Sequence, residues 1–83
     1  MPMINIAWTG AAIAQLVGLH RTQQGVVFIQ NHTQNWILTN ANGWAVNTVH
    51  NNFDPPTVTT VTATVALVSP ANINVNVTAI TSP

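Results

Sequence analysis

The carboxy-terminal part of the chain alternates between two kinds of side chain. Residues 72–80 read NINVNVTAI, so amide or hydroxyl residues take turns with aliphatic ones. Successive side chains of a β-strand point to opposite faces of its sheet, and this period of two therefore predicts a strand with one packed face and one polar face. Residues 57–68, TVTTVTATVALV, predict a second such strand; Val58 is out of step, which suggests a bulge near Thr59 and Thr60.

Three further strands are expected in the middle of the chain. Residues 26–30, VVFIQ, form a short β-branched and aromatic run that is typical of a strand buried on both faces. Residues 35–50 contain Asn42-Gly43 between two apolar runs, which favours a β-hairpin with a type I′ turn. In that hairpin Trp36 and Trp44 would point to opposite faces of the sheet.

The amino-terminal residues 3–19 are mostly apolar. Helical spacing within this run predicts a helix over residues 10–20, and the alternatives are a strand at residues 4–8 followed by this helix or by a second strand, or a membrane or filament-core helix. No basic region precedes the run, so we do not expect a secretory signal. Its 17 residues are at the lower limit for a membrane span.

Together these elements predict a mainly β fold. We expect a small antiparallel β-sandwich or barrel-like domain of about five strands over residues 25–83, preceded by an apolar helix or arm over residues 1–24. A chain of 83 residues forms one domain, and such a small domain buries only about 60% of its unfolded surface. The chain has no cysteine, and its three histidines lack the spacing of a structural metal site, so oligomerisation is the remaining stabiliser.

Charged side chains are nearly absent. Asp, Glu, Lys and Arg make up 2% of the residues, as Arg21 and Asp54 alone, whereas about 25% is usual. Without cations the surface does not attract phosphate, and we expect no nucleic-acid partner. A hydrophobic content of 47% argues against disorder. Eleven Asn and twelve Thr supply the polarity, and another protein surface can cover these groups without the desolvation of ions, which costs several kcal/mol.

The residues needed for catalysis or for a cofactor are scarce. One carboxylate, three scattered histidines and no cysteine do not supply an evident set of nucleophile, base and orienting group, so we expect neither an enzyme nor a cofactor. Asp54 precedes Pro55-Pro56, where a role in a turn is the ordinary expectation.

The sequence favours a structural subunit that assembles with copies of itself. Soluble monomers protect exposed edge strands with lysine, inward-pointing charges or proline, and residues 57–68 and 72–80 contain no charge. We therefore expect a filament, appendage or coat protein, outside the cell or at the surface of a particle, whose residues 3–19 dock into a neighbouring subunit. The expected interface residues are Ile13, Leu16, Val17, Ile73, Asn74, Val75, Asn76 and Val77.

Two alternatives remain open. Aromatic and amide groups close together in the sequence are also typical of a small oligomeric carbohydrate-binding lectin with glycan ligands; its expected binding residues are Trp36, Trp44, His50, Asn52 and Asp54. The second alternative is a membrane-inserting β-hairpin formed by residues 57–68 and 72–80, which are long enough for strands of about 9–11 residues. These strands lack flanking aromatic residues, so a membrane is the less favoured partner.

Overall fold

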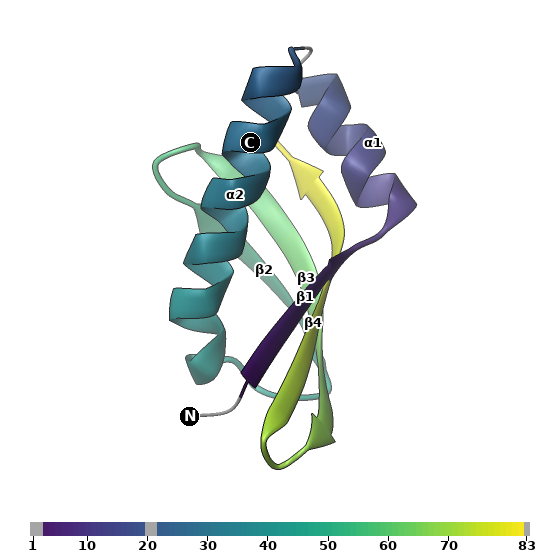
Figure 1. The fold of residues 1–83 in the computed structure, drawn as a ribbon, viewed down its shortest axis with the longest axis vertical. Helices are drawn as coiled ribbons and strands as arrows, with labels where there is room; N and C mark the ends of the chain where they lie inside the picture. The colour runs from purple at the N-terminus through teal and green to yellow at the C-terminus, as the bar shows by residue number, and fades with distance from the viewer. Residues whose placement is uncertain (1–2, 20–21, 83) are drawn as a thin grey trace.

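The chain folds into one four-stranded sheet with two helices on the same side of it (Figure 1). The computed structural model describes residues 3–19 and 22–82. The elements in chain order are β1 (Met3–Trp8), α1 (Gly10–Leu19), α2 (Gln23–Asn40), a short 3-10 turn (Ala41–Gly43), β2 (Thr48–Asp54), β3 (Thr59–Ser69) and β4 (Asn72–Thr81).

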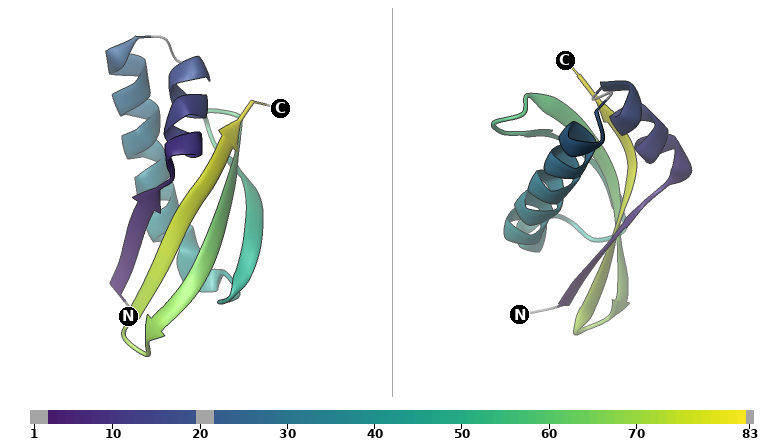
Figure 2. Two further views of the ribbon diagram at one scale, coloured as in Figure 1. Left: turned by 90° about the vertical axis from the view of Figure 1, so that its right-hand side faces the viewer. Right: turned by 45° about the horizontal axis from the view of Figure 1, so that its top comes forward.

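The sheet is mixed and has the strand order β1-β4-β3-β2. The left view of Figure 2 shows the four strands side by side in this order. The first and last strands of the chain, β1 and β4, run parallel, whereas the β4–β3 and β3–β2 pairs are antiparallel. The carboxy-terminal strand therefore lies in the middle of the sheet, between segments from both halves of the chain.

The hydrophobic core lies between the helices and one face of the sheet. The alternating aliphatic residues of β3 and β4 form its floor, and a few residues of each helix form its cover. Its buried hydrophobic residues are Ala12, Leu16, Ile29, Ile37, Ala41, Val61, Ala63, Val65, Ile73, Val75, Val77 and Ile80. The opposite face of the sheet is not covered by any element of residues 3–19 and 22–82.

The alternation of buried and exposed side chains holds through most of β3 and β4. The register of this strand pair shifts between Thr62 and Ala63 and again between Leu67 and Ser69, not near Thr59 and Thr60 as expected. Val77 pairs with Ala63 while Ala79 pairs with Thr62, so Thr78 is an extra residue in β4. This bulge shifts the alternation by one residue and places Ile80, rather than Ala79, in the core. The bulge predicted near Thr59 and Thr60 is wrong.

Val58 is out of step for a different reason. It lies in the turn before β3 and has a φ of 58°, so it precedes the strand instead of interrupting it. At the other end of β3, Leu67 was expected on the packed face but is exposed. The β3–β4 hairpin extends past the end of the helical layer there, at the lower end of Figure 1, and nothing in the described chain covers Leu67.

The amino-terminal segment is part of the fold rather than an arm. Residues 3–8 form an edge strand, and the helix expected over residues 10–20 is present as α1; His20 lies outside the described residues. The Thr9 hydroxyl caps α1 by accepting a hydrogen bond of 3.2 Å from the Ala12 backbone N–H. Ala12 and Leu16 are buried against the sheet.

The strand at residues 26–30 and the hairpin at residues 35–50 were wrong predictions, because residues 23–40 form α2. The Thr22 hydroxyl caps this helix by accepting a 3.2 Å hydrogen bond from Gly25 N–H. The buried positions of the helix are Ile29, Thr33 and Ile37. A spacing of four residues places them on one helical face, and packing of that face outweighs the β propensity of the Val-Val-Phe-Ile run.

The architecture is mainly β with two helices, as expected in outline, but it is not a five-stranded sandwich or barrel. Two of the expected strand segments contribute to a helix, which leaves too few strands to close the sheet. Asn42-Gly43 lies in the 3-10 turn that follows α2, where it ends the helix instead of joining two strands.

Adjacent residues of α2 allow a direct test of this packing. Ile37 is fully buried and Leu38 is 45% exposed, although the two are isomeric side chains on the same helix. We expect Ile37→Ala to lower the free energy of unfolding by about 2–5 kcal/mol, because it leaves a cavity under the helix. Leu38→Ala should change it by no more than about 0.5 kcal/mol. Urea denaturation followed by circular dichroism measures both, and equal losses would contradict the described helix face.

Candidate functional site

The expected interface residues occupy different environments in the fold. Four of them lie in the core of their own chain and are not available to a neighbour: Leu16, Ile73, Val75 and Val77. The other four are exposed: Ile13 and Val17 on α1, and Asn74 and Asn76 on the uncovered face of the sheet. Only the second group remains a set of candidate contact residues.

The edges of the sheet are β1 and β2, not the two strands expected from the sequence. Both β3 and β4 have a neighbouring strand on each side over most of their length. The strand NINVNVTAI is thus a central strand of the sheet. In the described part of the chain, β1 pairs only with β4 and β2 only with β3, which leaves one side of each backbone open.

The β2 edge combines apolar and polar groups on its two faces. Val49, Asn51 and Phe53 point to the uncovered face, and both apolar side chains are 60% exposed. His50 and Asn52 point toward the helices and are half-buried. The outward-facing part of this edge therefore carries two large apolar side chains and no charge.

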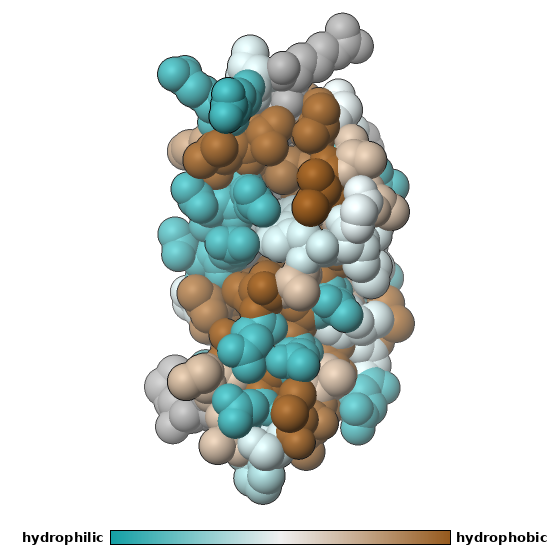
Figure 3. Space-filling model, turned by 45° about the vertical axis from the view of Figure 1, so that its right-hand side comes forward, coloured by the Kyte–Doolittle hydropathy of each residue, from teal (hydrophilic) through white to brown (hydrophobic). Residues whose placement is uncertain are grey.

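The uncovered face of the sheet is an array of amides and hydroxyls. Asn5 lies opposite Asn74, and Asn76 lies opposite Thr64. The Thr62 hydroxyl donates a 2.5 Å hydrogen bond to the Asn51 side-chain oxygen across β2 and β3. Figure 3 shows hydrophobic and hydrophilic residues interspersed on the side of the molecule that carries α1 and β1. The centre of this face is consequently well suited to contact with water.

Three of the five residues expected for a lectin site do meet. Trp36 and Trp44 pack edge to face with ring centres 5.8 Å apart, so the expectation that they point to opposite faces was wrong. The His50 ring stacks on Trp44 at 4.9 Å and thereby covers one face of that indole. Both indoles also pack against the core, so the cluster joins α2 and the following loop to β2.

Asp54 is the centre of a second polar cluster, which links the end of β2 to α2. Its side chain is fully buried and accepts a hydrogen bond from the Thr33 hydroxyl on Oδ2. His32 Nε2 lies 3.2 Å from Asp54 Oδ1 and 2.5 Å from the backbone oxygen of Pro55. The hydrogen-bond partner of Nε2 is the Pro55 oxygen, whereas Asp54 Oδ1 is within ion-pair distance but accepts no hydrogen bond from the described residues.

Burial raises the pKa of the Asp54 carboxyl above its ordinary value of 3.8. The loss of water around the ionised form is the largest cause, and the Thr33 hydrogen bond and the charge of His32 offset it only in part. The ionised carboxylate is therefore less favourable in the folded protein than in the unfolded chain. On α2, the Thr33 hydroxyl stabilises the carboxylate by a hydrogen bond and His32 does so by its charge.

The cluster contains a hydroxyl, a carboxylate and an imidazole, but not in the order that nucleophilic catalysis needs. In a catalytic triad the histidine lies between the hydroxyl and the carboxylate, so that it can accept the hydroxyl proton. Here Asp54 lies between Thr33 and His32, and the Thr33 proton is held by the carboxylate. Thr33 is also fully buried. This arrangement supports a structural role.

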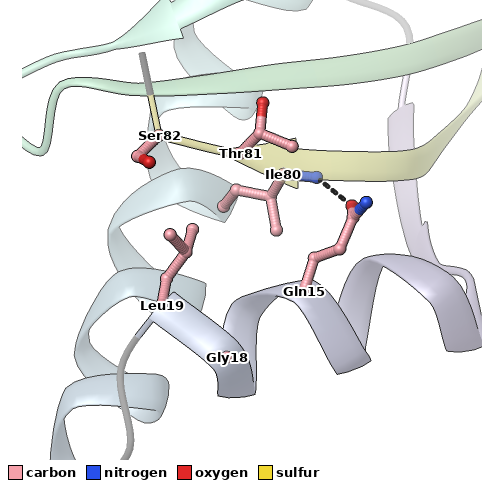
Figure 4. A pocket seen from close by; sticks show the side chains of 6 residues that line it. All are labelled: Gln15, Gly18, Leu19, Ile80, Thr81 and Ser82. Carbon is pink, nitrogen blue, oxygen red and sulfur yellow. Dashed lines mark hydrogen bonds between the residues drawn. The ribbon is translucent and has the colours of Figure 1, made fainter.

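Two shallow hollows lie at the ends of the helices. One, of about 390 Å³, is lined by Gln23, Gln24, Val27 and Phe28 at the start of α2. The other, of about 240 Å³, lies between α1 and the end of β4 (Figure 4). There the Gln15 side-chain oxygen accepts a 2.9 Å hydrogen bond from Ile80 N–H, and the Ile80 side chain points toward α1. Neither hollow contains an ionisable group in its described lining.

Neither α1 nor α2 is long and apolar enough to cross a membrane. Comparisons with protein-family models, with curated proteins and with solved structures found no significant match.

The role of Thr33 and His32 was not foreseen from the sequence. A signal was present, because Thr33 lies four residues after Ile29 and four before Ile37, in the middle of an otherwise aliphatic stripe. A buried threonine needs a polar partner, and the single carboxylate of the chain was the obvious acceptor. The pairing was missed because the sequence predicted a strand at residues 26–30 and a hairpin at residues 35–50, with Thr33 in a turn between them.

The raised pKa of Asp54 makes stability depend on pH in a defined direction. A carboxyl whose folded pKa exceeds its unfolded pKa contributes most at low pH, and that contribution is lost as the pH rises through the folded pKa. Between about pH 3 and about pH 6 we therefore expect the wild type to lose stability relative to Asp54→Asn. Only the wild type has a carboxyl at this position that ionises in that range. Parallel profiles from urea titrations would contradict the assignment.

Proposed function

We propose that this chain is a structural subunit that associates with copies of itself through the edge strands of its sheet. The observation that carries the proposal is the state of the two edges. Apart from the fully buried Asp54, neither β1 nor β2 contains a charged residue, and neither contains proline. Natural soluble proteins use such residues, or a covering segment, to prevent strands of separate molecules from pairing.

The apolar side chains at these edges support the same proposal. Val49 and Phe53 on β2 and Met3 on β1 are each at least 60% exposed. Pairing with another strand would bury part of this surface and satisfy the open backbone groups at the same time. A filament, an appendage or a coat at the surface of a particle or outside the cell is the kind of assembly that we propose for such a subunit.

The two alternative functions receive less support from the geometry. A sugar ligand needs an accessible carboxylate or amide beside an open aromatic face, whereas Asp54 is fully buried and His50 covers a face of Trp44. A membrane-inserting hairpin would have to be formed by β3 and β4. The aliphatic side chains of these strands are the floor of the core, and insertion would require their separation from both helices.

Charge placed at an edge should prevent the association. We expect Val49→Lys on β2 and Asn5→Lys on β1 each to weaken pairing at the edge that it alters by about tenfold or more, which corresponds to about 1.4 kcal/mol, because pairing with another strand would remove water from the added ammonium group. Asn76→Lys is the matched control, since it adds the same charge on a central strand. Light scattering over a range of protein concentrations gives the molar mass. A wild-type protein that is monomeric at all concentrations would refute the proposal.

A further inference from the structure

The β2 edge has a pattern that matches its own reversed copy. Its outward side chains run Val49, Asn51, Phe53, with an amide between two apolar groups. We propose that two copies of this chain pair β2 with β2 in an antiparallel manner, around a two-fold axis at Asn51. This inference rests on the proposed self-association and specifies the strand, the direction and the register of the contact.

The direction follows from the strand order. Because β1 runs parallel to β4 and each of the remaining neighbours is antiparallel, β1 and β2 point the same way. Copies added head to tail in one continuous sheet, with β2 of one beside β1 of the next, would therefore form a parallel pair. Two copies related by a two-fold axis perpendicular to the sheet form an antiparallel pair, which is slightly more stable per residue. Both helical layers then remain on the same side.

The register follows from the length of β2 and from the pattern of its side chains. The strand has seven residues, and Asn51 is the central one. Pairing about Asn51 aligns all seven residues and places Val49 of one copy opposite Phe53 of the other. A slip of two residues pairs only five and sets Asn51 opposite an apolar side chain. A slip of one residue would set outward residues against inward ones, which the alternation of a sheet forbids.

The side chains on the helix-facing side of β2 are compatible with this register. His50 of one copy would lie opposite Asn52 of the other, and both can donate and accept hydrogen bonds. The β1 edge does not offer the same match. It has six residues, so no residue is central, and full overlap around a two-fold axis would place outward residues opposite inward ones.

The chemistry of the edge favours a second copy over other partners. A charged peptide would find no complementary charge on Val49, Asn51 or Phe53. A copy of the same strand brings an apolar group to each apolar group and an amide to the amide. Cross-strand pairs of an aromatic and a β-branched side chain, such as Phe53 with Val49, stabilise a sheet.

Single cysteine variants test the register directly, because the chain contains no cysteine of its own. Under mild oxidation we expect Asn51→Cys to form a disulfide-linked dimer at least tenfold faster than the control Asn76→Cys on central strand β4. Val49→Cys alone and Phe53→Cys alone should not exceed that control. In the proposed register each lies four residues, or about 13 Å, from its counterpart, beyond the separation of about 7 Å that a disulfide can bridge. An equimolar mixture of these two variants should yield the mixed dimer.

The outcomes separate this inference from the proposed function. Light scattering on the unmodified protein reports association independently of any cysteine. The β2 contact is refuted, and self-association stands, if the protein associates but Asn51→Cys is oxidised no faster than Asn76→Cys. The same conclusion follows if Asn5→Cys on β1 gives the dominant dimer. If Val49→Cys alone dimerises efficiently, the register is refuted. A protein that stays monomeric refutes both. Circular dichroism of each variant confirms that it is folded.

Discussion

The burial of one face of β3 and β4 under two helices is the constraint on which the rest of the structure depends. The aliphatic half of each strand supplies seven of the twelve buried hydrophobic residues, and it needs a cover. Helices α1 and α2 provide that cover from one side only, so the amide and hydroxyl half of both strands faces outward. The position of β4 in the middle of the sheet further requires that β1, from the opposite end of the chain, pair with it. The fold therefore closes only when both ends of the chain have come together.

Asp54 connects this architecture to the surface chemistry. It is the only acidic side chain, and the fold places it inside, where Thr33 and His32 of α2 hold it at the end of β2. Burial of an ionisable group is unfavourable in itself, as the raised pKa of its carboxyl shows. The Thr33 hydrogen bond and the charge of His32 limit this effect and link α2 to the end of the edge strand. A consequence is that neither the edges nor the open face of the sheet carries an exposed acidic charge.

The sequence predicted the parts of the fold that depend on local patterns. The strands at β3 and β4 were expected because a period of two continues over about ten residues, and the helix at α1 was favoured over its alternatives by helical spacing. The prediction for the segment from Gln23 to Gly43 was wrong. A β-branched run is compatible with a strand or a helix, and an Asn-Gly pair can form a hairpin turn or end a helix. The helical stripe contains the polar residue Thr33, whose partner Asp54 lies 21 residues away in the sequence. Which strands form the edges depends on the parallel pairing of β1 with β4, and no local pattern encodes that pairing.

The same topology determines what kind of assembly edge pairing would build. The centre of the open face consists of amides and hydroxyls that form hydrogen bonds with water. Stacking of two such faces would therefore bring little apolar surface together. Edge pairing, in contrast, also satisfies the open backbone groups. A two-fold pair joined at β2 presents an identical β1 edge at each of its ends. If these edges also pair, growth continues with alternating contacts, and the resulting filament has no direction. Head-to-tail pairing of β2 with β1 would instead give a filament with two different ends. The symmetry of the β2 contact thus decides whether the proposed assembly is polar.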